Sequence, residues 1–171
     1  RDIYLYKEFD FNVKEIGYYA WFPYVGAMIG SICGGWHAKR LLDNHSVNFT
    51  RKRTVSIGCT VIFISIIGAI LFADTPEKFV SFVFLVLFGF QFSISNIQTI
   101  PSDLLSGKSV GTLAGLGGSI GAISVIIMNW LIPIITVESY TPAFMILAVL
   151  APLATLSLYL LIKEIKPIEN N

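Results

Sequence analysis

The chain has 171 residues, of which 54% are hydrophobic and 13% are charged, and its formal net charge is +1 at pH 7. The charged share is about half of that in an ordinary soluble domain. The basic residues are also too few and too dispersed to form a surface that follows a nucleic-acid backbone. The composition therefore excludes a soluble globular domain and a nucleic-acid partner.

Five long apolar runs follow one another along the chain. Each is long enough to cross the hydrocarbon layer of a bilayer, about 30 Å thick, as an α-helix. The sequence therefore predicts an all-α polytopic membrane protein embedded in a lipid bilayer. The predicted helices cover residues 16–42, 54–73, 79–101, 110–135 and 141–162.

The first 15 residues precede these runs. They contain a short apolar stub, residues 3–6, that ends at Lys7. We expect the stub to be the tail of an earlier membrane helix, followed by an extracellular link. The chain is then expected to be a piece of a longer protein.

The first run carries glycines at every fourth position, Gly26, Gly30 and Gly34. This spacing places them on one face of a helix, where a second helix backbone can approach closely. Glycine is also common in membrane helices in general. The aromatic residues at the start of the run are typical of the membrane interface, but Trp21 or Tyr24 could instead point inward and stack on a sugar ring.

Basic residues are distributed unevenly between the two sides of the predicted membrane. Eight Lys or Arg residues fall in the 43–53 loop, the helix ends beside it, the 102–109 link and the 163–171 tail, and four fall on the other side. The positive-inside rule then places the loop and the C-terminus in the cytoplasm. The glycosylation sequon at residues 48–50 lies on that side, and we interpret it as an ordinary loop.

The third run changes from wholly apolar to rich in neutral polar residues. Its polar residues form one stripe on a helix and must face protein or a water-filled cavity, because lipid offers them no hydrogen bonds. They either join neighbouring helices or line a cavity that binds a polyhydroxylated solute. Pro101 is expected to end the helix. The stripe consists of Gln91, Ser95, Gln98 and Ser102.

The fourth run is dense in glycine near its start and includes Gly115 and Gly118. Such a helix either packs tightly or bends. No Asp, Glu, Lys or Arg lies deep in any run, and His37 and His45 lack the partners of a metal site or a catalytic dyad. We therefore expect no enzyme, no cofactor and no metal.

Residues 34–42, GGWHAKRLL, and the basic triplet at 51–53 resemble a signature of the major facilitator superfamily. In that family, a glycine-rich helix end, an Asp-Arg pair and a second basic cluster form the cytoplasmic loop between transmembrane helices 8 and 9. Gly35, Arg40 and Arg53 match the signature, whereas Lys39 stands where the family usually has Asp.

The likeness extends over essentially the whole chain. Residues 4–9 look like the end of helix 7, and the polar third run and the glycine-dense fourth run look like helices 10 and 11. Together they resemble the anion:cation symporter branch and are similar to bacterial hexuronate and galactonate transporters. The resemblance implies the C-terminal half-domain of a twelve-helix transporter, paired with an N-terminal half in a bacterial inner membrane.

The resemblance also implies a function. It points to a secondary active transporter that moves a small organic anion, such as a hexuronate, by alternating access coupled to protons. By position, and with the polar stripe, the candidate solute contacts are Tyr24, Gln91, Ser95, Gln98 and Ser119. The alternative is an integral membrane subunit that transports nothing and whose helices only pack against partners.

Overall fold

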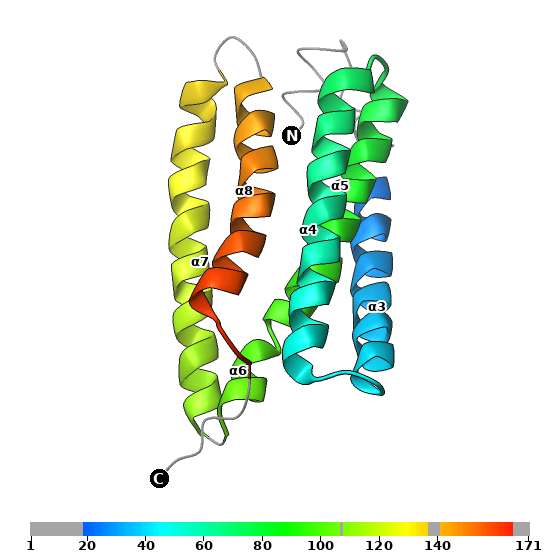
Figure 1. The fold of residues 1–171 in the computed structure, drawn as a ribbon. Helices are drawn as coiled ribbons and strands as arrows, with labels where there is room; N and C mark the ends of the chain where they lie inside the picture. Colours follow the sequence, from blue (N-terminus) through cyan, green and yellow to red (C-terminus); the bar gives the residue numbers. More distant parts are fainter. Residues whose placement is uncertain (1–18, 107, 137–140, 166–171) are drawn as a thin grey trace.

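The computed structural model describes residues 19–106, 108–136 and 141–165. These residues form helices and connecting turns, with no strand among them (Figure 1). The all-α prediction is therefore confirmed, whereas the predicted helix stub and link in residues 1–15 lie outside the described part. The helices are α3 (Phe22–Leu42), α4 (Val47–Phe72), α5 (Pro76–Ile97), α6 (Ile100–Leu104), α7 (Lys108–Ile135) and α8 (Thr141–Leu161).

Among the described residues, four helical stretches are long and apolar enough to cross a membrane: Val47–Phe72, Pro76–Leu104, Ser109–Ile135 and Thr141–Leu161. The chain is therefore an integral membrane protein. The fifth predicted span, α3, has 21 residues but is not among these stretches, and it contains glycines and a basic last turn. It packs along α5, which is one of the spanning helices (Figure 1).

Helix α4 begins at Val47, seven residues before the start that the apolar run predicts. Ser46 caps the helix, and its hydroxyl accepts a hydrogen bond from the backbone N–H of Phe49 at 3.3 Å. A helix can continue beyond the hydrocarbon layer with charged side chains, so hydropathy alone places its start too late. The loop interpretation of the sequon at residues 48–50 is wrong, because these residues form the first turn of α4 and Thr50 is fully buried.

The polar end of the third run is interrupted rather than simply ended. Pro101 has no N–H to donate to the carbonyl of Ile97, and α5 ends at Ile97. The chain turns at Gln98 and Thr99, where the Thr99 hydroxyl donates to the carbonyl of Asn96 at 2.8 Å. One further helical turn, α6, then contains Pro101 near its start.

The link before α5 carries an exposed ion pair. The Lys78 ammonium lies 2.6 Å from the Asp74 carboxylate, one helical turn away. This hydrogen bond holds the pKa of Asp74 below its ordinary value.

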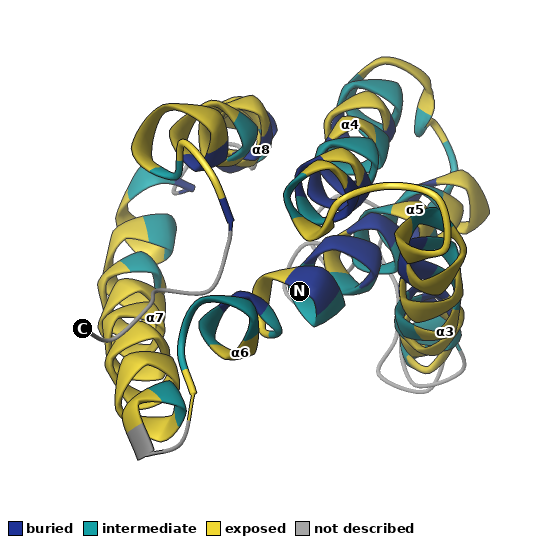
Figure 2. Ribbon diagram, turned by 60° about the horizontal axis from the view of Figure 1, so that its bottom comes forward, coloured by how far each residue is buried: buried dark blue, intermediate teal, exposed yellow. Residues whose placement is uncertain are grey.

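Helices α3, α4 and α5 form one group, and α8 lies against α4 (Figures 1 and 2). Helix α7 is exposed along almost its whole length (Figure 2). Its large apolar side chains suit contact with lipid, as with Trp130, which is 78% exposed. The main buried cluster joins α4, α6, α8 and the segment after α8, and consists of Val55, Cys59, Ile100, Ala151, Leu158 and Ile165.

Candidate functional site

The glycines of α3 lie directly on the backbone of α5. Gly26, Gly30 and Gly34 are all buried. A Cβ atom added to Gly26 would lie 2.5 Å from the Phe84 carbonyl oxygen, one added to Gly34 would lie 2.6 Å from that of Phe92, and Gly30 meets the backbone of Phe88 in the same way. Because both helices repeat this contact every fourth residue, their backbones run together over two turns.

Two hydrogen bonds define which sides of α3 and α5 face α4. His37 Nδ1 of α3 is hydrogen-bonded to the Thr54 hydroxyl at 3.2 Å, and the Ser93 hydroxyl of α5 donates to the Val55 carbonyl at 3.2 Å. Side chains on the opposite sides of α3 and α5 are therefore turned away from α4.

Two candidate solute contacts lie on that opposite side. Gln91 is about 200° around α5 from Ser93, and Tyr24 is about 140° around α3 from His37, at about 100° per residue. Tyr24 is 61% exposed, and Gln91 is half-buried. The structure thus turns both side chains to the face of the α3–α5 pair that is remote from α4. We call this face, which holds these two candidate contacts, the solute face.

The other candidates have different surroundings. Ser95 is between the helices: its hydroxyl donates to the Phe92 carbonyl at 3.2 Å and lies beside Gly34. Gln98 is exposed and directly follows the last residue of α5. Ser119 is exposed on α7, which stands apart from α3 and α5 (Figure 2), and its hydroxyl donates to the carbonyl of Gly115 at 2.9 Å.

The glycines of α7 have a spacing similar to that of the α3 glycines, but no described helix packs against them. A Cβ atom added to Gly115 or Gly118 would meet no other described atom within 4 Å. The tight packing expected for these two glycines is therefore not formed with the described helices.

A polar cluster at the end of α5 consists of Arg51, Asn96 and Asp103. Arg51 donates to both carboxylate oxygens of Asp103, at 2.7 and 3.3 Å, and to the amide oxygen of Asn96 at 3.0 Å. The Asn96 amide nitrogen donates in turn to the Gly34 carbonyl at 3.3 Å. The side chains of Arg51 and Asp103 are only 12% and 18% exposed. This cluster joins α3, α4, α5 and α6 across the helix interruption.

The sequence had pointed to other residues of the basic loop. Gly35 faces open space, Arg40 is exposed with its guanidinium 4.2 Å from the centre of the Trp36 ring, and Arg53 is exposed with its guanidinium 5.7 Å from the centre of the Phe49 ring. The ion pair is made by Arg51 instead. The sequence feature that could have indicated this ion pair is Asp103. An acid just past an apolar run needs a basic partner when it is buried.

Metal binding finds no support in the described part of the chain. No group of three or more His, Cys, Asp or Glu residues there could hold a metal ion. Cys33 and Cys59 are free thiols, and Cys59 is buried in the main apolar cluster.

Two buried threonines of α4 offer a matched test of this interior. Both are 0% exposed, but the Thr54 hydroxyl is bonded to His37 whereas the Thr50 hydroxyl has no partner among the described residues. We expect Thr50→Val to raise the free energy of unfolding by about 1 kcal/mol and Thr54→Val to lower it by about 1 kcal/mol. Thermal unfolding of the purified protein checks this, and shifts of the same sign would contradict it.

Two curated proteins align with almost the whole chain. They are the hexuronate transporters of Escherichia coli strain K12 and of Escherichia coli O157:H7, and each is 26% identical over 172 residues. Each alignment covers 98% of this chain and 39% of the relative. The chain is similar to hexuronate transporters. This finding confirms the resemblance that the loop and the helix sequences predict.

The similarity to hexuronate transporters extends over the α3–α5 pair, the polar cluster and α7 alike. No protein-family model matches the chain. The chain spans about two fifths of the length of the hexuronate transporters that it matches, which is consistent with the C-terminal portion of such a protein.

Proposed function

We propose that the chain is the C-terminal half-domain of a secondary active transporter for a small organic anion, a sugar acid such as a hexuronate. The observation that carries this proposal is the similarity to hexuronate transporters over 98% of the chain. The four long apolar helices support the proposal, because secondary transporters are built from membrane-spanning helices.

The solute face is the proposed binding surface within this half. The Gln91 amide can donate to and accept from sugar hydroxyls, and the Tyr24 ring can stack on the apolar face of a sugar ring. Gln98 and Ser119 are proposed to complete the surface at its end and from α7. Ser95 is proposed to position α3 against α5, because its hydroxyl is already engaged within that interface.

We propose that the remainder of the transporter supplies the opposite wall of the cavity. In this scheme the two halves rock to open the cavity alternately to each side of a bacterial inner membrane, with the C-terminus in the cytoplasm. The deep charged groups that bind the solute carboxylate and carry a coupling proton then belong to the N-terminal half. This assignment follows from the sequence of α3, α5 and α7, whose central turns hold no charged residue.

Replacement of Gln91 tests the solute face. In the full-length protein that contains this chain, Gln91→Ala is expected to weaken binding of galacturonate or glucuronate about tenfold, because it removes hydrogen bonds to the solute. Isothermal titration calorimetry on the purified protein measures this affinity, and the expression level checks folding.

Ser93→Ala is the matched control, because Ser93 is two residues away on α5 and faces α4. It is expected to lower thermal stability slightly and to leave the solute affinity unchanged. If Gln91→Ala lowers stability and leaves the affinity intact, the polar stripe serves packing alone.

A further inference from the structure

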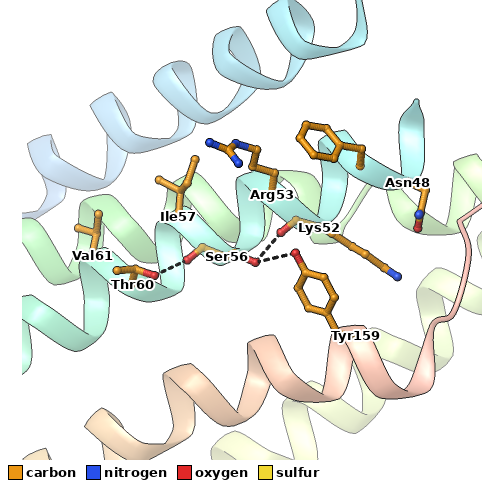
Figure 3. Close-up of a pocket in the computed structure, with 9 residues that line it drawn as sticks. Asn48, Lys52, Arg53, Ser56, Ile57, Thr60, Val61 and Tyr159 are labelled. Atoms are coloured by element: carbon orange, nitrogen blue, oxygen red, sulfur yellow. Dashed lines mark hydrogen bonds between the residues drawn. The ribbon is translucent and has the colours of Figure 1, made fainter. Parts of the chain in front are cut away.

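A groove runs along the surface of α4 beside α8. At its polar end is a cavity of about 560 Å³, lined by the first half of α4 and by Tyr159 of α8 (Figure 3). Two basic side chains, Lys52 and Arg53, line this end, and none of the other described lining residues is acidic. Hydroxyl and amide groups complete the polar lining, and Ser56 and Tyr159 are hydrogen-bonded to each other at 3.4 Å.

The groove continues as an apolar cavity of about 620 Å³ along the same two helices. Thr60 and Tyr159 line both cavities, so the two adjoin. Beyond these two residues the lining is almost wholly apolar: Cys59, Phe63, Val149, Pro152, Leu153 and Leu156, with Thr155 beside them.

Among the described residues that line the cavity, none carries a negative charge to balance Lys52 and Arg53. Lys52 is only 7% exposed, and its ammonium donates to the Lys163 carbonyl at 2.9 Å and lies 5.2 Å from the centre of the Tyr159 ring. Neither partner carries a negative charge, and burying a cation without an anion is costly. Arg53 is exposed beside it. Both cations line the cavity and would attract an anion bound there, although they extend from α4 in different directions (Figure 3).

We propose that this groove binds an anionic phospholipid. The phosphate headgroup lies against Lys52, Arg53 and Tyr159, and one acyl chain follows the apolar part of the groove. An anionic lipid matches both the polar and the apolar part of the groove. Basic pockets between membrane helices bind anionic headgroups, and apolar side chains contact the acyl chain. The site lies on α4 and α8, away from the solute face, and is independent of the proposed function.

Native mass spectrometry of the full-length protein tests the site. The protein is titrated with dioleoyl phosphatidylglycerol and, separately, with dioleoyl phosphatidylcholine, in the absence of any sugar acid. The anionic lipid is expected to bind more tightly. Arg53→Gln is expected to weaken its binding about fivefold, because one basic residue near a membrane surface contributes a binding free energy of this size.

Arg40→Gln is the matched control, since Arg40 is an exposed arginine above an aromatic ring but lies outside the groove. It is expected to leave the affinity for phosphatidylglycerol unchanged. Leu153→Trp, which fills the apolar part, is expected to weaken binding of both lipids. Glycerol 3-phosphate, which lacks acyl chains, is expected not to bind detectably.

Three results would overturn the proposal. The first is equal affinity for the two lipids, and the second is an equal loss with Arg53→Gln and Arg40→Gln, which would show a diffuse attraction to basic surface. The third is binding of glycerol 3-phosphate as tight as that of the lipid. Loss of sugar-acid transport would change none of these outcomes, since the lipid titration contains no solute.

Discussion

Gly30→Ala is expected to lower the free energy of unfolding of the full-length protein by about 3 kcal/mol. The new methyl group would meet the backbone of Phe88, including its carbonyl oxygen, and a backbone cannot rotate away as a side chain can. The two helices would have to separate and would lose close contacts along both flanking turns. Thermal and denaturant unfolding in detergent micelles measure the effect.

Gly35→Ala supplies the control on the same helix. No other described atom lies within 4 Å of a Cβ added to Gly35. This change is expected to stabilise the protein by up to about 1 kcal/mol, because alanine is a better helix former than glycine. Similar losses of stability for the two variants would mean that α3 does not pack on α5 through its glycine face.

Arg51→Met is expected to destabilise the protein by about 3 kcal/mol. It leaves the Asp103 carboxylate, whose side chain is 18% exposed, without its cation, and it removes the donor to the Asn96 amide oxygen. The helix interruption between α5 and α6 then loses its ion pair and hydrogen bond to α4. The same unfolding measurements report the loss.

The double variant Arg51→Met with Asp103→Leu is expected to recover most of that stability, because it leaves neither charge buried alone. Arg53→Gln is expected to have little effect on stability, since Arg53 is exposed. A double variant as unstable as Arg51→Met alone would show that the ion pair does not account for the loss.

Hydropathy predicted where the helices lie, but it did not predict the start of α4 or the interruption between α5 and α6. The apolar runs locate α5, α7 and α8 to within a few residues of their observed bounds. The start of α4 depends on the Ser46 cap and on polar turns that lie outside any apolar run. The interruption before Pro101 depends on one missing N–H, which leaves the hydropathy of the segment unchanged.

Glycine spacing shows what a helix surface permits, not which neighbour uses it. Gly30 and Gly115 both belong to four-residue repeats, yet Gly30 is buried on a backbone, whereas a Cβ atom added to Gly115 would meet no other described atom within 4 Å. Similarly, the ion pair joins Arg51 to Asp103, 52 positions apart in the chain. Helical periodicity relates residues within one helix, so pairs of this kind depend on tertiary packing.

The sequence could not show which candidate solute contacts are exposed and which lie between helices. A period of 100° per residue puts Gln91 and Ser95 on one stripe of α5. Close approach of α3 draws Ser95 into the interface beside Gly34 and leaves Gln91 at its edge. The difference arises from the position of a second helix, which the stripe alone does not encode.

Uptake into proteoliposomes tests the central claim most directly. The full-length protein is reconstituted, and entry of radiolabelled galacturonate or glucuronate is followed with and without a pH gradient. We predict saturable uptake that unlabelled hexuronate competes away and that an inward proton gradient accelerates. Uptake no faster than in protein-free liposomes, from protein shown to be folded, would contradict the account and would favour a membrane subunit that transports nothing.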